Sequence, residues 1–178
     1  MHTPPTGNGY VRIALVGPPI FLHWTSPALG VTAGVFALAT AGRLAGPVFL
    51  WTTSAFMLLV VIHEFGHAAA AWLLGAKVEG IVLAGTGGWC LTSPSKPLAP
   101  LETVALYSGG LLAQAIILIA TVVALYVYGA PSYLPLNCTV IVFTVWNVVL
   151  FVANAVPRSS NDGEMIYEAL VQLRRRDA

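Results

Sequence analysis

The sequence predicts an all-α, polytopic membrane protein that crosses the bilayer about four times. Hydrophobic residues make up 57% of the 178 residues and charged residues only 8%, whereas a soluble domain has about 25% charged residues. Several apolar segments exceed the roughly 20 residues that a helix needs to cross a bilayer. No basic stripe with interleaved aromatic residues is present, so no nucleic-acid partner is expected. We therefore expect a single membrane-embedded domain, residues 1–178, surrounded by lipid.

The order of apolar and polar segments divides this domain into three parts. An N-terminal segment, residues 1–19, precedes a transmembrane core, residues 20–156, whose expected spans are 26–41, 47–74, 101–128 and 136–156. Between the second and third spans, β-prone residues interrupted by glycines at 77–92 predict a small β-hairpin. Residues 157–178 hold a polar loop and then an amphipathic helix. That helix is expected to lie at the membrane interface because it is too short and too charged to cross.

The distribution of basic residues predicts the orientation. With four spans, both termini and the hairpin share one side, and seven of the eight Lys and Arg residues lie there, leaving Arg43 on the other. Because cytoplasmic loops are enriched in Lys and Arg, we expect cytoplasmic termini in a prokaryotic cell membrane. Cys90 and Cys138 then face opposite sides, so no disulfide is expected. No cleavable signal peptide is expected either, because the first apolar run is long and no small-residue cleavage site follows it.

The second expected span contains the pattern H-E-x-x-H at residues 63–67. Residues four apart lie on the same face of a helix, so His63 and His67 can offer two imidazole nitrogens to one metal ion. Glu64 is then placed to act as a general base. Ionisable side chains inside a membrane are costly and mark function by default. The pattern therefore predicts a metal site within the membrane.

A catalytic zinc site uses three protein ligands, so a third ligand is required. The remaining candidates are His2, His23, Glu79, Glu102, Asp162, Glu164, Glu168 and Asp177. Asp162 is the best choice because it lies just past the cytoplasmic end of the fourth span, near the depth of the histidines. Gly163 after it allows a close backbone approach. The alternative is that Asp162 only caps the following helix, since aspartate is favoured at that position.

Several motifs together resemble the site-2 proteases, a family of intramembrane zinc metalloproteases. The H-E-x-x-H is the first. The second is N-P-x-P-x-x-x-x-D-G, whose Asn, second Pro, Asp and Gly are matched here by Asn154, Pro157, Asp162 and Gly163. Gly87-Gly88 resembles a glycine-containing strand of the family, and the segment from Gly109 to Gln114 resembles its G-P-x-x-N element. No PDZ or CBS module is expected in a chain of this length.

The resemblance implies a zinc-dependent endopeptidase with one Zn²⁺ held by His63, His67 and Asp162. Glu64 would be the catalytic base. The substrate would be a transmembrane protein or membrane-bound peptide, cut in or near its membrane segment, and its strand-like backbone would be bound by Asn154, Gly87 and Gly88. Regulation would come from a membrane partner, the lipid or substrate availability.

The chain departs from the family motifs at four positions, Ala155, Asn161, Leu111 and Gln114, none of which is a ligand or the base. Ala155 and Leu111 stand where the family has proline, Gln114 where it has asparagine, and Asn161 where an apolar residue is common. The alternative function is a non-proteolytic membrane protein that keeps the fold for metal binding. A structural zinc site usually has four protein ligands, and only three good ones are visible in the sequence, which disfavours this alternative.

Overall fold

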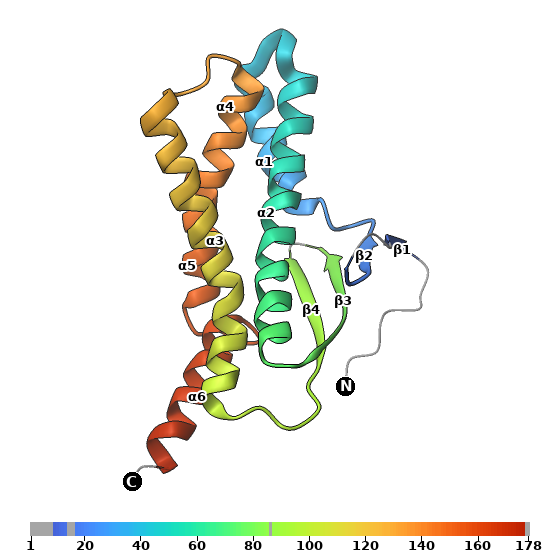
Figure 1. Ribbon diagram of the computed structural model, residues 1–178. Coiled ribbons are helices and arrows are strands. Elements are labelled where there is room, and N and C mark those ends of the chain that lie inside the picture. The colour runs from blue at the N-terminus through green and yellow to red at the C-terminus, as the bar shows by residue number, and fades with distance from the viewer. Residues whose placement is uncertain (1–8, 14–16, 86, 177–178) are drawn as a thin grey trace.

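The computed structural model describes residues 9–13, 17–85 and 87–176, and His2 and Asp177 lie outside them. The chain forms a helical bundle with a small sheet against one side (Figure 1). The elements follow in the order β1 (Tyr10–Ile13), β2 (Ile20–His23), α1 (Ala28–Ala41), η1 (Gly42–Leu44), α2 (Ala45–Leu73), β3 (Lys77–Ala84), β4 (Gly87–Ser93), α3 (Pro100–Tyr128), α4 (Leu134–Ile141), η2 (Val142–Trp146), α5 (Asn147–Ala155) and α6 (Asp162–Arg176).

Three helical stretches of the described chain are long and apolar enough to cross a membrane. They are Gly42–Leu73, Pro100–Tyr128 and Leu134–Ala155, close to the second, third and fourth expected spans. The first expected span appears as α1, which has only 14 residues. At 1.5 Å per residue it extends about 21 Å, less than the roughly 30 Å of a bilayer core. The expected count of four complete spans is therefore not confirmed.

The ends of the long helices follow from local chemistry. Pro100 stands in the first turn of α3, where its missing N–H is not needed, and Glu102 Oε2 accepts a hydrogen bond from the Ala99 N–H at 2.8 Å. Gly75 follows α2 with a φ of 70°, a left-handed conformation that glycine adopts without a steric penalty. The third stretch is continuous from α4 to α5, but the five residues of η2 form a π-helical turn.

The predicted hairpin is present and belongs to a larger mixed sheet with strand order β1-β2-β3-β4. β3 and β4 are antiparallel, with Val82 opposite Trp89. The sequence did not predict the parallel pairing of β2 with β3, which places Phe21 opposite Val82. In Figure 1 the sheet lies beside the lower half of α2, while α1 lies beside its upper half. β4 is thereby brought next to the helix that carries the H-E-x-x-H.

Two packing contacts fix α2 within the bundle. Phe56 and Leu59 are buried against Val142 of the π-helical turn. Lower down, α2 crosses α3 where Gly66 meets Gly109, because a Cβ on either glycine would overlap the backbone of the other. Small residues let membrane helices approach at backbone distance in this way. Gly66 lies between His63 and His67 in the sequence, so the crossing brings α3 close to both histidines.

Candidate metal centre

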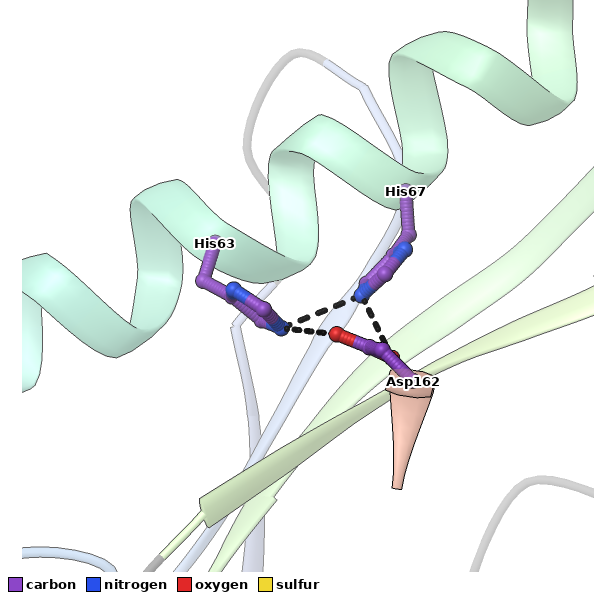
Figure 2. Close-up of side chains that lie close together, drawn as sticks. All are labelled: His63, His67 and Asp162. Atoms are coloured by element: carbon purple, nitrogen blue, oxygen red, sulfur yellow. Dashed lines mark hydrogen bonds and ion pairs between the residues drawn. The ribbon is translucent and has the colours of Figure 1, made fainter. Parts of the chain in front are cut away.

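The first two candidate ligands lie on one face of α2. His63 and His67 are buried, with 7% of each residue exposed. Their rings meet edge to face, and the two Nε2 atoms are 3.1 Å apart. Figure 2 shows both rings pointing from successive turns of α2 toward the same point. The helical spacing therefore brings two imidazole nitrogens together, as the sequence predicted.

Asp162 reaches the same point from the start of α6. Its Oδ2 is 3.1 Å from His63 Nε2 and its Oδ1 is 3.3 Å from His67 Nε2 (Figure 2). The ligand atoms of the three residues lie within 4.8 Å of one another. Burial raises the pKa of Asp162, but contacts with the two imidazoles outweigh that effect and lower it to about 2. Asp162 is therefore a carboxylate at neutral pH.

The other nitrogen of each imidazole is held by α3. His67 Nδ1 is 2.9 Å from the backbone oxygen of Leu106, and His63 Nδ1 is 3.1 Å from Gln114 Oε1. A carbonyl oxygen only accepts hydrogen bonds, so each Nδ1 carries the hydrogen. Each Nε2 of a neutral ring then presents its lone pair toward Asp162. Hydrogen bonds of this kind fix the tautomer and orientation of metal-binding histidines in general.

This arrangement fits a divalent metal ion. Two imidazole lone pairs and a carboxylate repel one another at about 3 Å unless a cation lies between them. The buried Asp162 Oδ2 accepts no hydrogen bond from any described residue. Zinc bonds of about 2.0–2.1 Å in a tetrahedron place ligand atoms about 3.3 Å apart. The two Nε2 atoms are 3.1 Å apart, and each lies 3.1 or 3.3 Å from a different oxygen of Asp162, which is close to this spacing.

Glu64 lies beside these three residues but outside the ligand group. It is 4% exposed, and it contacts β4 at Gly88. A Cβ on Gly88 would lie 2.7 Å from Glu64 Cγ and 2.8 Å from its Oε1. The glycine therefore leaves the space that the carboxylate occupies. Glu64 lies between the two histidines of α2 and strand β4.

An open cavity of about 1040 Å³ connects these groups. His63, Glu64, His67 and Asp162 line it, together with the three residues that the resemblance suggested for substrate binding, Asn154, Gly87 and Gly88. Cys90 also lines the cavity, but burial raises the pKa of its thiol to about 12. Its thiol is therefore protonated at neutral pH, and Cys90 does not belong to the ligand group. The functional roles of the lining residues stay predictions.

The other candidate ligands are engaged elsewhere or stand apart from the group. His23 lies in β2, with its Nδ1 2.7 Å from Thr25 Oγ1. Glu79 pairs with Lys77 at 3.0 Å and Glu102 pairs with Lys96 at 3.3 Å. Glu164 accepts a hydrogen bond from the backbone of Ser160. Glu168 lines the cavity but is exposed and does not belong to the ligand group.

The sequence does not predict some of the hydrogen bonds and close contacts around the candidate metal centre. Leu106 acts through a backbone oxygen, which leaves no signal in the side-chain pattern. Gly110 lies against both rings, since a Cβ there would be 2.5 Å from His63 Cε1 and from His67 Nε2. The Gly109-Gly110 pair was the only signal for this close approach. Asn161 departs from the family motif, and the sequence does not predict the four hydrogen bonds of its side chain.

Comparison with known proteins decides the family. The family model described as Peptidase M50B-like matches residues 28–158. The chain belongs to this peptidase family. The resemblance to the site-2 proteases is thus confirmed. A solved structure titled "Site-2 Protease from Methanocaldococcus jannaschii" is similar to this peptidase in fold, with a TM-score of 0.64 and 22% sequence identity. The match covers 91% of this chain and 71% of that one. No curated protein matches the sequence.

Proposed function

We propose that this member of the Peptidase M50B-like family is a zinc-dependent intramembrane endopeptidase. The observation that carries the proposal is the convergence of His63, His67 and Asp162 on one point beside Glu64. The two histidines lie in a helix long and apolar enough to cross a membrane. The substrates would be membrane-anchored proteins, cut in or near their transmembrane segments. Signal-peptide remnants and other precursor peptides belong to the same class.

His63, His67 and Asp162 would hold the zinc ion, which would supply a Lewis acid to the substrate carbonyl. Glu64 would accept a proton from the attacking water and pass it to the nitrogen of the leaving amine as the C–N bond breaks. Leu106 and Gln114 would keep both histidine rings oriented through their Nδ1 atoms. Asn154, which lines the same cavity, would donate a hydrogen bond to the substrate backbone or the developing oxyanion.

A transmembrane substrate must first lose its helical hydrogen bonds, because these protect its backbone. β4 offers a surface for the unwound segment. It is the last strand in the sheet order, and among the described residues only β3 pairs with it. Residues 87–92 of β4 line the cavity beside Glu64. An extended substrate could add to this strand edge, with main-chain hydrogen bonds supplying affinity.

We also propose that both termini face the cytoplasm of a prokaryotic cell. Seven of the eight Lys and Arg residues support this orientation. The connections after α1 and α3 lie at one end of the bundle, whereas β3, β4 and α6 lie toward the other (Figure 1). The cavity would then open toward the cytoplasmic side, where water can reach Glu64.

The decisive experiment replaces Glu64 by glutamine in the full-length protein. The wild type should contain about one zinc and cleave a membrane-anchored peptide. The Glu64→Gln variant should keep the zinc but lose cleavage by about 10²- to 10⁴-fold, because the amide cannot accept the proton. Glu79→Gln is the matched control, since Glu79 pairs with Lys77 away from the cavity. Cleavage that persists in Glu64→Gln would contradict the mechanism.

The same experiment distinguishes the proposed peptidase from the alternative function, a non-proteolytic metal-binding membrane protein. That function predicts zinc in the wild type and no cleavage of any peptide in a panel of membrane-anchored substrates. Only three ligands form the group among the residues that the structure describes. A catalytic zinc site uses three protein ligands and leaves a position open, so the geometry favours the peptidase.

A further inference from the structure

The side chain of Asn161 makes four hydrogen bonds in the loop before α6. Its Nδ2 donates to the backbone oxygens of Ala153 at 2.9 Å and Val156 at 2.7 Å. Its Oδ1 accepts from the backbone N–H groups of Arg158 at 3.1 Å and Glu164 at 3.0 Å. A carboxamide has two donor hydrogens and two acceptor lone pairs. Asn161 therefore uses its full hydrogen-bonding capacity on main-chain atoms.

These bonds join the ends of two helices. The oxygens of Ala153 and Val156 belong to the C-terminal end of α5, where carbonyl groups lack helical partners. The N–H of Glu164 belongs to the first turn of α6, where N–H groups lack them as well. One side chain thus satisfies groups at both ends, so α6 begins at a fixed position relative to α5.

Asn161, and not Asp162, is the N-cap of α6. Its Oδ1 accepts from the N–H three residues later, the usual pattern for an asparagine N-cap. Glu164 reaches back to the N–H of Ser160, which completes a reciprocal arrangement similar to a capping box. The carboxylate of Asp162 is therefore not required for capping. This removes the alternative that the sequence left open, and it leaves both carboxylate oxygens directed at His63 and His67.

The first turn of α6 has little room to move. Gly163 packs against the end of α5 so closely that a Cβ would overlap the backbone oxygen of Ala155. Ser160 has a φ of 65°, a left-handed conformation that a residue other than glycine rarely adopts. Asn161 forms hydrogen bonds to backbone groups both before and after the loop while the loop keeps this conformation. A displacement of the loop would carry Asp162, the next residue, away from the histidines.

We propose that Asn161 is the positioning residue that holds Asp162 at the metal centre. An aliphatic side chain could fill the same space, but it could satisfy neither the α5 carbonyls nor the α6 N–H. Serine could still cap α6 through its hydroxyl, but it lacks the two amide donors. The order of zinc affinity should therefore be wild type, then Asn161→Ser, then Asn161→Leu. This inference rests on the proposed function, because zinc binding is the property that Asn161 supports.

The test measures zinc affinity of the full chain in detergent, by titration against a competing chelator after metal removal. Asn161→Leu should bind zinc about 10- to 100-fold more weakly, as expected when a residue that orients a ligand is lost. Asn161→Ser should lie between Asn161→Leu and the wild type. Asn137→Ala is the control: Asn137 lies in α4, outside the cavity lining. It should bind zinc as the wild type does.

Two further readouts separate positioning from a purely structural role. The absorption spectrum of the Co²⁺-loaded protein reports ligand geometry, and it should change in Asn161→Leu but not in Asn137→Ala. The melting temperature of the metal-free protein reports stability alone. A lower melting temperature with unchanged zinc affinity and an unchanged Co²⁺ spectrum would overturn the inference. If Asn161→Leu does not fold, Asn161→Ser decides the matter by the same two measurements.

Failure of the inference and failure of the proposed function have different signatures. If the wild type and Asn137→Ala bind zinc and Asn161→Leu binds it equally well, the inference is wrong and the proposed function stands. If the wild type itself binds no zinc, the proposed metal centre is wrong, and the role of Asn161 is overturned with it.

Discussion

Replacing Gly110 by alanine tests whether α3 sets the geometry of the metal centre. A Cβ at this position would lie 2.5 Å from His63 Cε1 and His67 Nε2, and 2.7 Å from His63 Nε2. Ordinary van der Waals contact begins near 3.4 Å, so the atoms must separate by about 0.9 Å. Metal–ligand distances hold within about 0.2 Å. The substitution therefore demands a displacement that the centre cannot absorb.

Two movements could relieve this clash, and each would break contacts that the structure shows. Turning the rings would break the hydrogen bonds from His63 Nδ1 to Gln114 and from His67 Nδ1 to Leu106. Moving α3 away from α2 would stretch the same bonds and open the backbone contact between Gly66 and Gly109. Either response displaces a ligand. A misplacement of about 1 Å costs about 10²-fold in rate, so Gly110→Ala should cleave about a hundredfold more slowly.

The assay compares Gly110→Ala with Gly46→Ala, measuring zinc content and peptide cleavage in detergent. Gly46 lies in the first turn of α2, and a Cβ there would meet no described atom within 4 Å. Alanine favours a helix over glycine, by about 1 kcal/mol in a helix interior, so helix propensity alone predicts a loss of stability at neither site. Gly46→Ala should behave as the wild type. Zinc content and cleavage close to wild type in Gly110→Ala would refute the reasoning.

Two other predictions address the support of the ligands and the orientation of the chain. Gln114→Ala removes the acceptor for His63 Nδ1 and should weaken zinc binding about 10- to 100-fold in a chelator competition assay, so unchanged affinity would exclude this role for Gln114. A fluorescent protein that folds only in the cytoplasm should fluoresce when fused after residue 178 of the chain in bacterial cells, and the same protein inserted near Arg43 should remain dark. The opposite pattern would reverse the orientation.

The sequence predicted the long helices and the grouping of His63, His67 and Asp162 because both depend on local patterns. Apolar composition placed three of the expected spans within a few residues of their observed ends. The i, i+4 spacing of His63 and His67 follows from helical geometry alone. Asp162 could be chosen because acids just past the end of the last expected span are few. In each case the information lies in neighbouring residues or in composition.

What the sequence did not predict depends on contacts between distant segments. Hydropathy reports that residues 26–41 are apolar, but it does not give the length of the helix, which has 14 residues in the structure. The pairing of β2 with β3 joins Phe21 to Val82 although α1, η1 and α2 lie between the two strands in the chain. The acceptor for His67 is a backbone oxygen of Leu106, which any residue type could supply. Such features follow from packing and leave little trace in the residue pattern.

The pair of helices α2 and α3 sets both the packing of the bundle and the geometry of the candidate metal centre. The contact of Gly66 with Gly109 fixes the distance between the helix backbones. At that distance, Leu106 and Gln114 reach the two Nδ1 atoms, and Gly110 leaves room for the rings. The same two helices cannot separate without disturbing the candidate ligands, so metal binding at this site would be coupled to helix packing. A ligand that binds only the folded state stabilises it, by about 4 kcal/mol at a thousand times its Kd. Under the proposed function, zinc should therefore stabilise the same α2–α3 contact that orients His63 and His67.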